Sequence, residues 1–321
     1  MRDKKNSHYW KRGGVEPCLL DNYMDNIITS KEINAIKFYL GDKNIVEQLI
    51  YRGGGKAYNT INALLNLGIR NEEDKAKENK VVEIYDVEHL KSYIGLIIDV
   101  FSASIKYRDS VNYDERSITS YRVDRLSSFQ TFISNKDNKI EGFFSTCKKG
   151  LLPQYANTKE DIVLLEVVRD SSVPYLDFED LLKDYYSKPE EAEILVPFGT
   201  KIANYDETTL SEEEKKIYKD RNGAAPKHKY VVKLTKGEYE EIPSELEGDY
   251  YNYIINEERL AHIINSMELL TSGQKLSDNE RDIYMKWKEM FNCFINSRIA
   301  KLFDEYSMEN NTSSIKKLNK H

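Results

Sequence analysis

Two glutamates separated by one residue stand directly ahead of an apolar stretch that reads ILVPFGT. If this stretch is a β-strand, Glu191 and Glu193 project from the same face, with Ala192 on the other. Carboxylates held side by side repel one another and raise one pKa, so the pair is unfavourable on an ordinary surface. The arrangement makes sense where a cationic substrate or a cationic transition state lies between them. The apolar run behind the pair predicts a rigid, buried support.

Two further polar residues precede this pair in strand-like sequence. Arg122 lies in SITSYRV, and Ser145 lies in GFFSTC. Each is ordinary alone, because such an arginine is commonly a surface ion-pair partner, and a serine at a strand end commonly bonds the backbone of a turn. They suggest a functional site only because they precede the two glutamates in a fixed order along the chain. Three widely spaced cysteines and five isolated histidines predict neither a disulfide framework nor a metal site.

These residues need a sheet to position them, and the sequence predicts one. Short runs rich in Val, Ile and aromatic residues alternate with polar loops in this part of the chain. DIVLLEVV and EILV are continuously apolar, so we expect them in the middle of a layered sheet, buried on both faces. The five runs are SITSYRV, IEGFFST, DIVLLEVV, EAEILVPF and HKYVVKLT.

Helices are predicted on both sides of the sheet region, which makes the fold class α+β. Apolar residues at helical spacing predict a helix from Val87 to Ser104, among others. Near the other end, Ser277 and Glu280 form a capping box ahead of an apolar stripe that includes Trp287. The predicted organisation is an N-terminal extension (1–24), a helical lobe (25–117), a strand-rich core (118–243), a C-terminal helical region (244–308) and a disordered tail (309–321).

Composition excludes some partners. A net charge of -7 does not suit a protein that binds nucleic acid mainly through phosphate contacts. No apolar run is long enough to span a bilayer, and the first twenty residues lack the apolar core of a signal peptide. We therefore expect a soluble protein with neither a nucleic-acid nor a membrane partner.

The order and the residue sequences of the motifs resemble those of the arginine-specific mono-ADP-ribosyltransferases of the arginine–serine–glutamate class. That family carries an aromatic-Arg strand, a Ser-Thr-Ser strand, and Glu-x-Glu before a strand reading roughly VLLPPGT. Here YR, STC and EAEILVPFGT stand in the same order, and INALLNLG is similar to a pattern in the family's helical lobe. The resemblance covers roughly residues 30–235. It implies an ADP-ribosyltransferase-like split β-sheet sandwich with an N-terminal helical lobe, to which this chain adds a C-terminal helical region.

The resemblance implies a role for each residue. Arg122 would hold the phosphate and the nicotinamide ribose of NAD, a role that suits its planar fork of donors. Ser145 would orient Glu193, which would accept the ribose 2′-hydroxyl and stabilise the positive charge that grows as the bond to nicotinamide breaks. Glu191 would position the acceptor guanidinium and help remove its proton. Tyr155 would pack against the nicotinamide ring.

Two positions depart from the family's pattern. Val123 stands where the family usually has glycine after the arginine, and Cys147 stands where it has serine. Neither departure removes a catalytic side chain. Val123 would present its backbone groups to the nicotinamide amide, with its branched side chain turned away from the pocket. Cys147 is interpreted as a small core residue.

The resemblance thus implies an enzyme that cleaves NAD, releases nicotinamide and moves ADP-ribose to an arginine of a target protein, with NAD as co-substrate and no metal. An NAD glycohydrolase with Glu191 idle and a catalytically inert binding scaffold are the alternatives. The absent signal peptide and the appended helices suit a bacterial effector or toxin. We expect it to be made in the bacterial cytoplasm and delivered by a dedicated secretion system into the host cytosol, where its target would be a host protein. The C-terminal helical region could recognise the target, restrain activity or complete the core.

Overall fold

The computed structural model describes residues 27–40, 57–65, 84–111, 118–134, 138–148, 161–182, 192–218 and 224–318. The described residues of the N-terminal part form the helices α2 (Ser30–Tyr39), α4 (Ala57–Leu65) and α6 (Val87–Ser110). α2 begins at a capping box made by Thr29 and Glu32. α6 runs past its predicted end, because Ile105 and Tyr107 continue the buried stripe of the helix.

Seven strands form one hydrogen-bonded sheet in the described part of the chain. They are β1 (Thr119–Arg125), β2 (Phe144–Cys147), β3 (Ile162–Arg169), β4 (Leu176–Asp177), β5 (Glu193–Val196), β6 (Lys201–Thr208) and β7 (His228–Thr235). Their order is β4-β5-β2-β1-β3-β7-β6, and only β3 and β7 are parallel. β1 and β3 share seven residue pairs, whereas β1 and β2 share the single pair Tyr121–Cys147 among the described residues. Two well-paired groups of strands therefore meet at a short seam between β1 and β2.

The predicted α+β class is confirmed, and the predicted strands are found with two additions. β3 is buried over nearly its whole length, as its apolar sequence predicts. The sequence does not predict β6, because KIANYDET lacks apolar alternation and its last six residues are exposed. β6 is held at the sheet edge by its pairing with β7, and β4 is too short for a sequence signal. The described residues between strands include the short helices α7 (Leu126–Ile133), α8 (Phe178–Leu181) and α9 (Glu212–Ile217).

Three helices form the C-terminal part: α10 (Ser244–Ile254), α11 (Glu257–Thr271) and α12 (Asp278–Leu318). α12 begins after the predicted capping box, in which the Ser277 amide donates to Glu280 Oε2 over 2.8 Å. α12 extends to Leu318, beyond residue 308, where the predicted C-terminal helical region ends. A polar segment has no apolar stripe to signal a helix. Extending an existing helix is nevertheless favourable, because each added residue contributes a backbone hydrogen bond without a new nucleation step.

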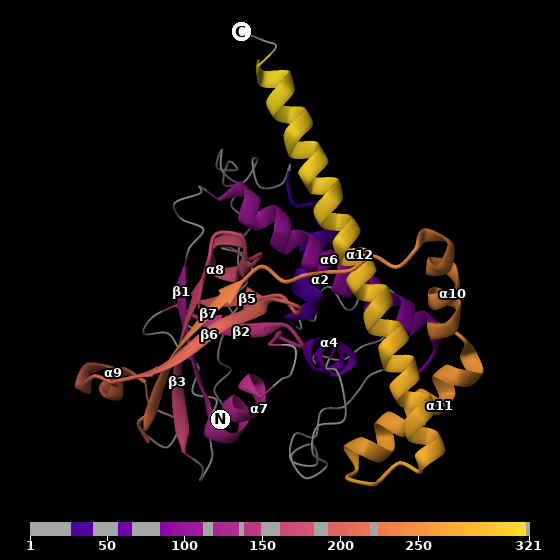
Figure 1. Cartoon of the computed structure of the whole chain (residues 1–321), viewed down its shortest axis with the longest axis horizontal. Coiled ribbons are helices and arrows are strands. Elements are labelled where there is room, and N and C mark those ends of the chain that lie inside the picture. Colours follow the sequence, from indigo (N-terminus) through magenta and orange to yellow (C-terminus); the bar gives the residue numbers. More distant parts are fainter. Residues whose placement is uncertain are drawn as a thin grey trace, which may run out of the picture.

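The helices from both ends of the sequence pack together beside the sheet (Figure 1). Trp287 and Phe291 of α12 are fully buried in a hydrophobic cluster that also contains residues of α2, α4 and α6. Ile194 and Leu195 of β5 belong to the same cluster. A second cluster contains Phe129 of α7 together with residues of β3, β5, β6 and β7. The C-terminal helices therefore share one core with the N-terminal helices and with β5.

A buried ion pair joins α2 to α6. The Glu32 carboxylate, 4% exposed, accepts hydrogen bonds from Lys106 Nζ (2.9 Å) and Ser102 Oγ (2.5 Å). Ser102 Oγ also lies 3.0 Å from the hydroxyl of Tyr306 in α12. Burial alone would raise the pKa of Glu32, but hydrogen bonds from Ser102, Lys106 and Thr29 outweigh it and hold that pKa below its ordinary value. The charged carboxylate thus fastens α2 to α6, and Ser102 connects them to α12.

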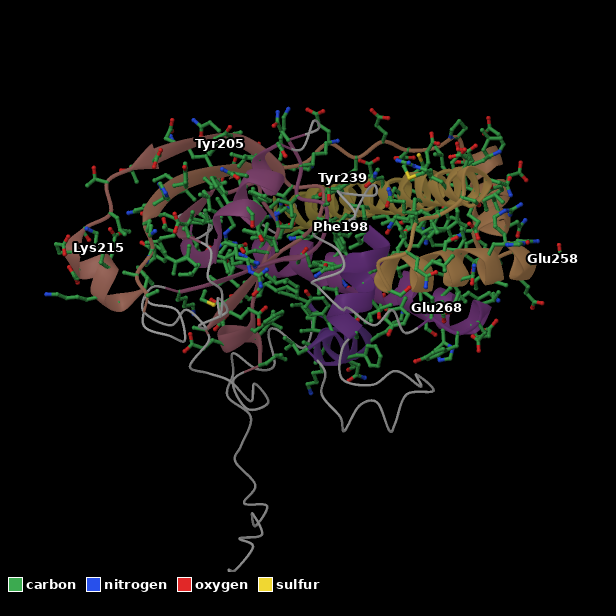
Figure 2. The ribbon with its side chains drawn as sticks, turned by 90° about the horizontal axis from the view of Figure 1, so that it is seen from below. Phe198, Tyr205, Lys215, Tyr239, Glu258 and Glu268 are labelled. Atoms are coloured by element: carbon green, nitrogen blue, oxygen red, sulfur yellow. The ribbon has the colours of Figure 1, made fainter. Side chains whose placement is uncertain are left out.

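The turn after β5 is fixed by two glycines and a tyrosine. Gly199 has a φ of +76°, in the left-handed region that favours glycine. A Cβ at Gly237 would lie 2.0 Å from the Gly199 carbonyl oxygen, so the two backbones are in close contact. The Tyr239 hydroxyl donates to the Phe198 carbonyl over 2.9 Å, and its ring stacks on Phe303 of α12. Phe198 and Tyr239 lie together between the strands and the helices (Figure 2), so the end of β5 is joined to α12.

Candidate active site

The neighbouring strands β5, β2 and β1 each carry one of the predicted site residues. Glu193 is the first residue of β5, Ser145 lies in β2, and Arg122 lies in β1. Cys147 pairs with Glu193 on one side and with Tyr121 on the other. Because adjacent strands lie about 4.8 Å apart, the backbones of Glu193 and Tyr121 are separated by about 10 Å. The sheet thus brings three residues that are distant in sequence to nearly one level.

The described contacts of the Arg122 guanidinium include Asp124, Ser145 and Phe144. Nε donates to Asp124 Oδ2 over 2.8 Å, and Nη1 donates to the Ser145 carbonyl oxygen over 2.9 Å. The guanidinium carbon lies 4.9 Å from the centroid of the Phe144 ring, a favourable distance for a cation and an aromatic face. The side chain of Arg122 retains 29% of its exposure. The protein therefore orients the guanidinium and leaves it reachable from solvent, as an anion-binding fork requires.

Side chains alternate along a strand, so the strand pairing determines the face from which each one leaves the sheet. Ser145 and Glu193 share the face of Cys147 and Tyr121, at a diagonal separation that a long side chain can span. Arg122 follows Tyr121 and therefore leaves from the opposite face. The structure brings the Ser145 and Glu193 side chains together on one face and does not place the Arg122 side chain there.

Arg122 nevertheless contacts the intervening strand. The β1–β2 ladder consists, within the described residues, of the pair Tyr121–Cys147, and the strands no longer pair at the level of Val123 and Ser145. There the hydrogen bond from Arg122 to the Ser145 carbonyl takes the place of a ladder bond. The seam thus has the Arg122 guanidinium on one face and the Ser145 hydroxyl on the other.

The backbone changes conformation immediately before Glu193. Ala192 is fully buried and has a φ of +38°, in the left-handed region, which costs a residue with a Cβ about 1–2 kcal/mol. The prediction that Glu191 and Glu193 share one face requires an extended backbone at Ala192, and the observed φ shows that this premise is wrong. Strand alternation ends at Glu193. Glu191 itself and Tyr155 lie outside the described residues.

The two positions that depart from the family's pattern are both buried. Val123 is 4% exposed and belongs to a small apolar cluster with Leu164 of β3. Its side chain is thus turned into the protein. Cys147 is 2% exposed, as expected of a small core residue.

Two residues contribute more to the site than the sequence predicts. The buried hydroxyl of Thr146 in β2 lies 2.8 Å from Ser120 Oγ in β1 and 3.1 Å from the Ile194 carbonyl oxygen in β5. It fastens the three strands that carry the predicted site residues. Asp124 orients Arg122, and the sequence contains a signal for it, because residues two apart on a strand share a face. Nothing in the sequence separates Thr146 from an ordinary threonine at a strand end.

A charged cluster lies at the end of β2, beside the chain that enters β5. Lys148 Nζ lies 2.9 Å from Asp177 Oδ2 and 2.7 Å from Glu179 Oε2. The Lys148 amide donates to the Ala192 carbonyl oxygen over 3.2 Å. Burial alone would lower the pKa of Lys148, but its hydrogen bonds to Glu179 and Asp177 hold that pKa above its ordinary value. Lys148 therefore remains charged and connects β2, β4 and the residue before Glu193.

Across the described parts of the chain, no group of three or more His, Cys, Asp or Glu side chains could hold a metal ion. None of the helices described there is long and apolar enough to cross a membrane. Among the described residues, Arg122, Ser145 and Glu193 carry a guanidinium, a hydroxyl and a carboxylate on the three neighbouring strands β1, β2 and β5. Their chemistry suits a ligand with phosphates and ribose hydroxyls, because a guanidinium pairs with phosphate oxygens and a carboxylate accepts from hydroxyls.

The sequence matches no protein-family model and no curated protein. Solved structures with a similar fold include bacterial ADP-ribosylating toxins. The ADP-ribosylating toxin BECa of a C. perfringens binary enterotoxin, solved with NADH, has a TM-score of 0.36 and 11% identity, over 84% of this chain and 61% of that one. The Vis toxin, an ADP-ribosyltransferase from Vibrio splendidus, has a TM-score of 0.31 and 13% identity, over 67% and 77%. C3stau2 from S. aureus, solved with NAD, has a TM-score of 0.30 and 16% identity, over 64% and 94%. Likeness at this level concerns the fold alone and gives no residue a role.

Proposed function

We propose that this chain is an NAD-dependent mono-ADP-ribosyltransferase that modifies an arginine side chain of a target protein. The observation that carries the proposal is the seam between β1 and β2. An oriented guanidinium, that of Arg122, bonds the backbone of Ser145 there, and Glu193 begins the next strand. The order of these residues in the chain is the order of the motifs of the arginine-specific transferases.

Arg122 would bind the phosphates of NAD. A guanidinium offers several donors in one plane and carries its charge at any physiological pH. In this structure it is already oriented by Asp124 and by the Phe144 ring, so little rotational freedom is lost when a phosphate binds. The phosphate would share the guanidinium with Asp124, since a planar fork can serve two acceptors.

Glu193 and Ser145 would act on the nicotinamide ribose. When the bond between ribose C1′ and the nicotinamide nitrogen breaks, its electron pair leaves with neutral nicotinamide, and positive charge develops on the ribose. A carboxylate that accepts the 2′-hydroxyl and faces this charge stabilises the transition state, as in glycoside cleavage. Ser145 leaves the sheet from the same face and would orient the carboxylate.

Glu191 would receive the acceptor in this reaction. A guanidino nitrogen of the target arginine forms the new bond to C1′ and then loses one proton, which a nearby carboxylate can accept. Tyr155 would pack against the nicotinamide. On this assignment, Glu191→Ala loses transfer to arginine and keeps part of the NAD hydrolysis, whereas equal loss of both activities would contradict the division of roles.

The decisive experiment uses NAD labelled in its adenylate half with agmatine, a small guanidine, as acceptor. We expect the wild type to label agmatine and to release nicotinamide in equal amount. Glu193→Gln removes the charge with little change of shape, and should reduce both rates by about 100-fold or more. The matched control is Glu268→Gln, which makes the same change at an exposed position of α11, among the C-terminal helices (Figure 2), and should leave both rates unchanged.

Each other outcome assigns a different function. Release of nicotinamide with no labelled acceptor, in agmatine or in a cell lysate, would indicate an NAD glycohydrolase. No turnover of NAD by the folded wild type would contradict the proposal and leave a binding scaffold. Turnover that survives Glu193→Gln would show that another residue carries the chemistry.

The natural partner would be a host protein with an accessible arginine, reached after export from a bacterium. The last residues of α12 lie beyond the contact of Tyr306 with Ser102. If they carry a delivery signal, deletion of residues 309–321 abolishes translocation and leaves activity in the test tube intact. Unchanged delivery would contradict this assignment.

A further inference from the structure

Ala192 has an unusual backbone for its residue type. In the described residues, Ala192 and Asn138 are the non-glycine residues with positive φ, at 38° and 49°. Asparagine visits this region because its short polar side chain can bond locally. Alanine has no such compensation, so the surroundings must hold it there. Ala192 is also completely buried and directly precedes Glu193.

The restraints on Ala192 come from the neighbouring strands. Its carbonyl oxygen accepts the Lys148 amide over 3.2 Å, which extends the β2–β5 ladder by one bond beyond the pair Cys147–Glu193. Lys148 is itself tied through Nζ to Asp177 of β4 over 2.9 Å. β4 pairs with β5 from the other side. The conformation of Ala192 is therefore fixed by β2 and indirectly by β4.

The left-handed backbone decides where Glu193 lies in its strand. With an extended Ala192 the strand would continue, and Glu193 would be an interior residue with chain on both sides. With the observed φ the backbone turns out of the extended conformation at Ala192, whose carbonyl oxygen accepts the last β2–β5 bond, so Glu193 is the terminal residue of β5. Its half-buried side chain thus stands at the end of the strand, on the face shared with Ser145.

We propose that Ala192 is a positioning residue, whose left-handed backbone sets the place and direction of the Glu193 carboxylate relative to a bound substrate. This inference rests on the proposed function, because it concerns the geometry of the reacting group. Ala192 touches no substrate in this account and acts through Glu193. The property that matters is the sign of φ, and the methyl group is secondary.

The test separates backbone conformation from packing with three variants. Ala192→Gly keeps positive φ accessible, because glycine adopts it without steric cost. Ala192→Val disfavours positive φ, which is a genuine outlier for a β-branched residue. If the valine variant does not fold, Ala192→Thr is used in place of the valine variant. Ala103→Val is the matched control, because it adds the same two methyl groups at a fully buried alanine of α6 that has helical backbone.

For each variant, kcat and KM for NAD are measured with agmatine, together with the thermal midpoint. We expect Ala192→Val to lower kcat by at least about tenfold with KM changed by less than about threefold, as a small displacement of a catalytic group predicts. Ala192→Gly should remain within about threefold of the wild type in kcat. Ala103→Val should lower the thermal midpoint while kcat stays near the wild-type value.

Two results would overturn the inference while the proposed function stands: unchanged kcat in Ala192→Val, or equal loss of kcat in Ala192→Gly and Ala192→Val. The second result would assign the effect to the buried methyl group. If the folded wild type turns over no NAD, the proposed function fails first and the positioning role fails with it.

Discussion

Replacing Trp287 by alanine tests whether the C-terminal helices are part of the core or a separable attachment. Trp287 is fully buried, and its ring stacks on Phe291 with 5.2 Å between centroids. Its Nε1 donates to the Ile254 carbonyl oxygen over 3.1 Å, which joins α12 to the end of α10. The same hydrophobic cluster contains helices of the N-terminal part. Removal of this side chain should therefore destabilise the whole protein.

The size of the effect follows from these contacts. Truncation of a buried tryptophan to alanine costs about 3–5 kcal/mol in transfer and cavity terms. The Ile254 carbonyl oxygen loses its buried donor, which adds about 1 kcal/mol. The total is about 4–6 kcal/mol. With an unfolding entropy of about 2.1 cal/mol/K per residue, a chain of 321 residues loses about 0.7 kcal/mol per degree near its midpoint. The thermal midpoint should fall by about 6–9 °C.

Differential scanning calorimetry of the whole chain measures this change. We expect one unfolding transition, shifted downward as a unit, and a parallel shift in the temperature at which agmatine labelling is lost. Met285→Ala is the control, because Met285 lies on the same helix with 40% exposure and its loss should move the midpoint by less than about 2 °C. A separate low-temperature transition in Trp287→Ala, with the remaining transition unchanged, would refute the single core.

Three further changes test other parts of the structure. Arg122→Lys keeps the charge but loses the planar fork, so KM for NAD should rise by about 10–100-fold with a smaller change in kcat, measured by steady-state kinetics; an unchanged KM would show that Arg122 does not bind NAD. Gly237→Ala forces a Cβ to within 2.0 Å of a backbone oxygen, so calorimetry should show destabilisation of about 1–3 kcal/mol, whereas Gly248→Ala, with open space around it, should show none. Because the pKa of Glu32 is held below its ordinary value of 4.5, its charge stabilises the folded protein fully above that pH and progressively less as pH falls through the folded pKa. The midpoint difference between wild type and Glu32→Gln, followed by circular dichroism, should therefore be largest near pH 7 and shrink below about pH 4.5; a difference independent of pH would contradict this.

The elements that the sequence predicts are those in which burial leaves a periodic trace. β3 is apolar over most of its length because it is covered on both faces, and α12 carries a stripe because one side faces the core. β6 leaves no such trace, since its stability comes from backbone pairing with β7 and its side chains are mostly exposed. α7 follows β1 without a loop, so its apolar residues merge with those of the strand. Hydrophobic patterns in a sequence indicate which residues are buried. They do not indicate an exposed edge strand that is held by backbone hydrogen bonds.

The candidate site shows the same division. That Arg122, Ser145 and Glu193 lie on neighbouring strands agrees with the order of the motifs. The face on which each side chain lies depends on register, and the sequence contains no information on the pairing Tyr121–Cys147. Strand alternation also fails at Ala192, because a rule based on extended backbone cannot anticipate a left-handed residue. The register between strands was thus the missing information in the first case, and the local backbone conformation in the second.

Glu193 depends on the helices as well as on the sheet. The two residues that follow it, Ile194 and Leu195, point to opposite faces of β5, yet both are buried in the cluster that contains Trp287. β5 is therefore packed on both faces at the two residues that follow Glu193. The turn after β5 is held by the hydrogen bond from Tyr239 to the Phe198 carbonyl oxygen. A carboxylate that acts in a transition state must be placed before the reaction begins, because its reorganisation would otherwise add to the barrier. The helices that complete the core thus also supply the rigidity that the proposed chemistry requires of Glu193.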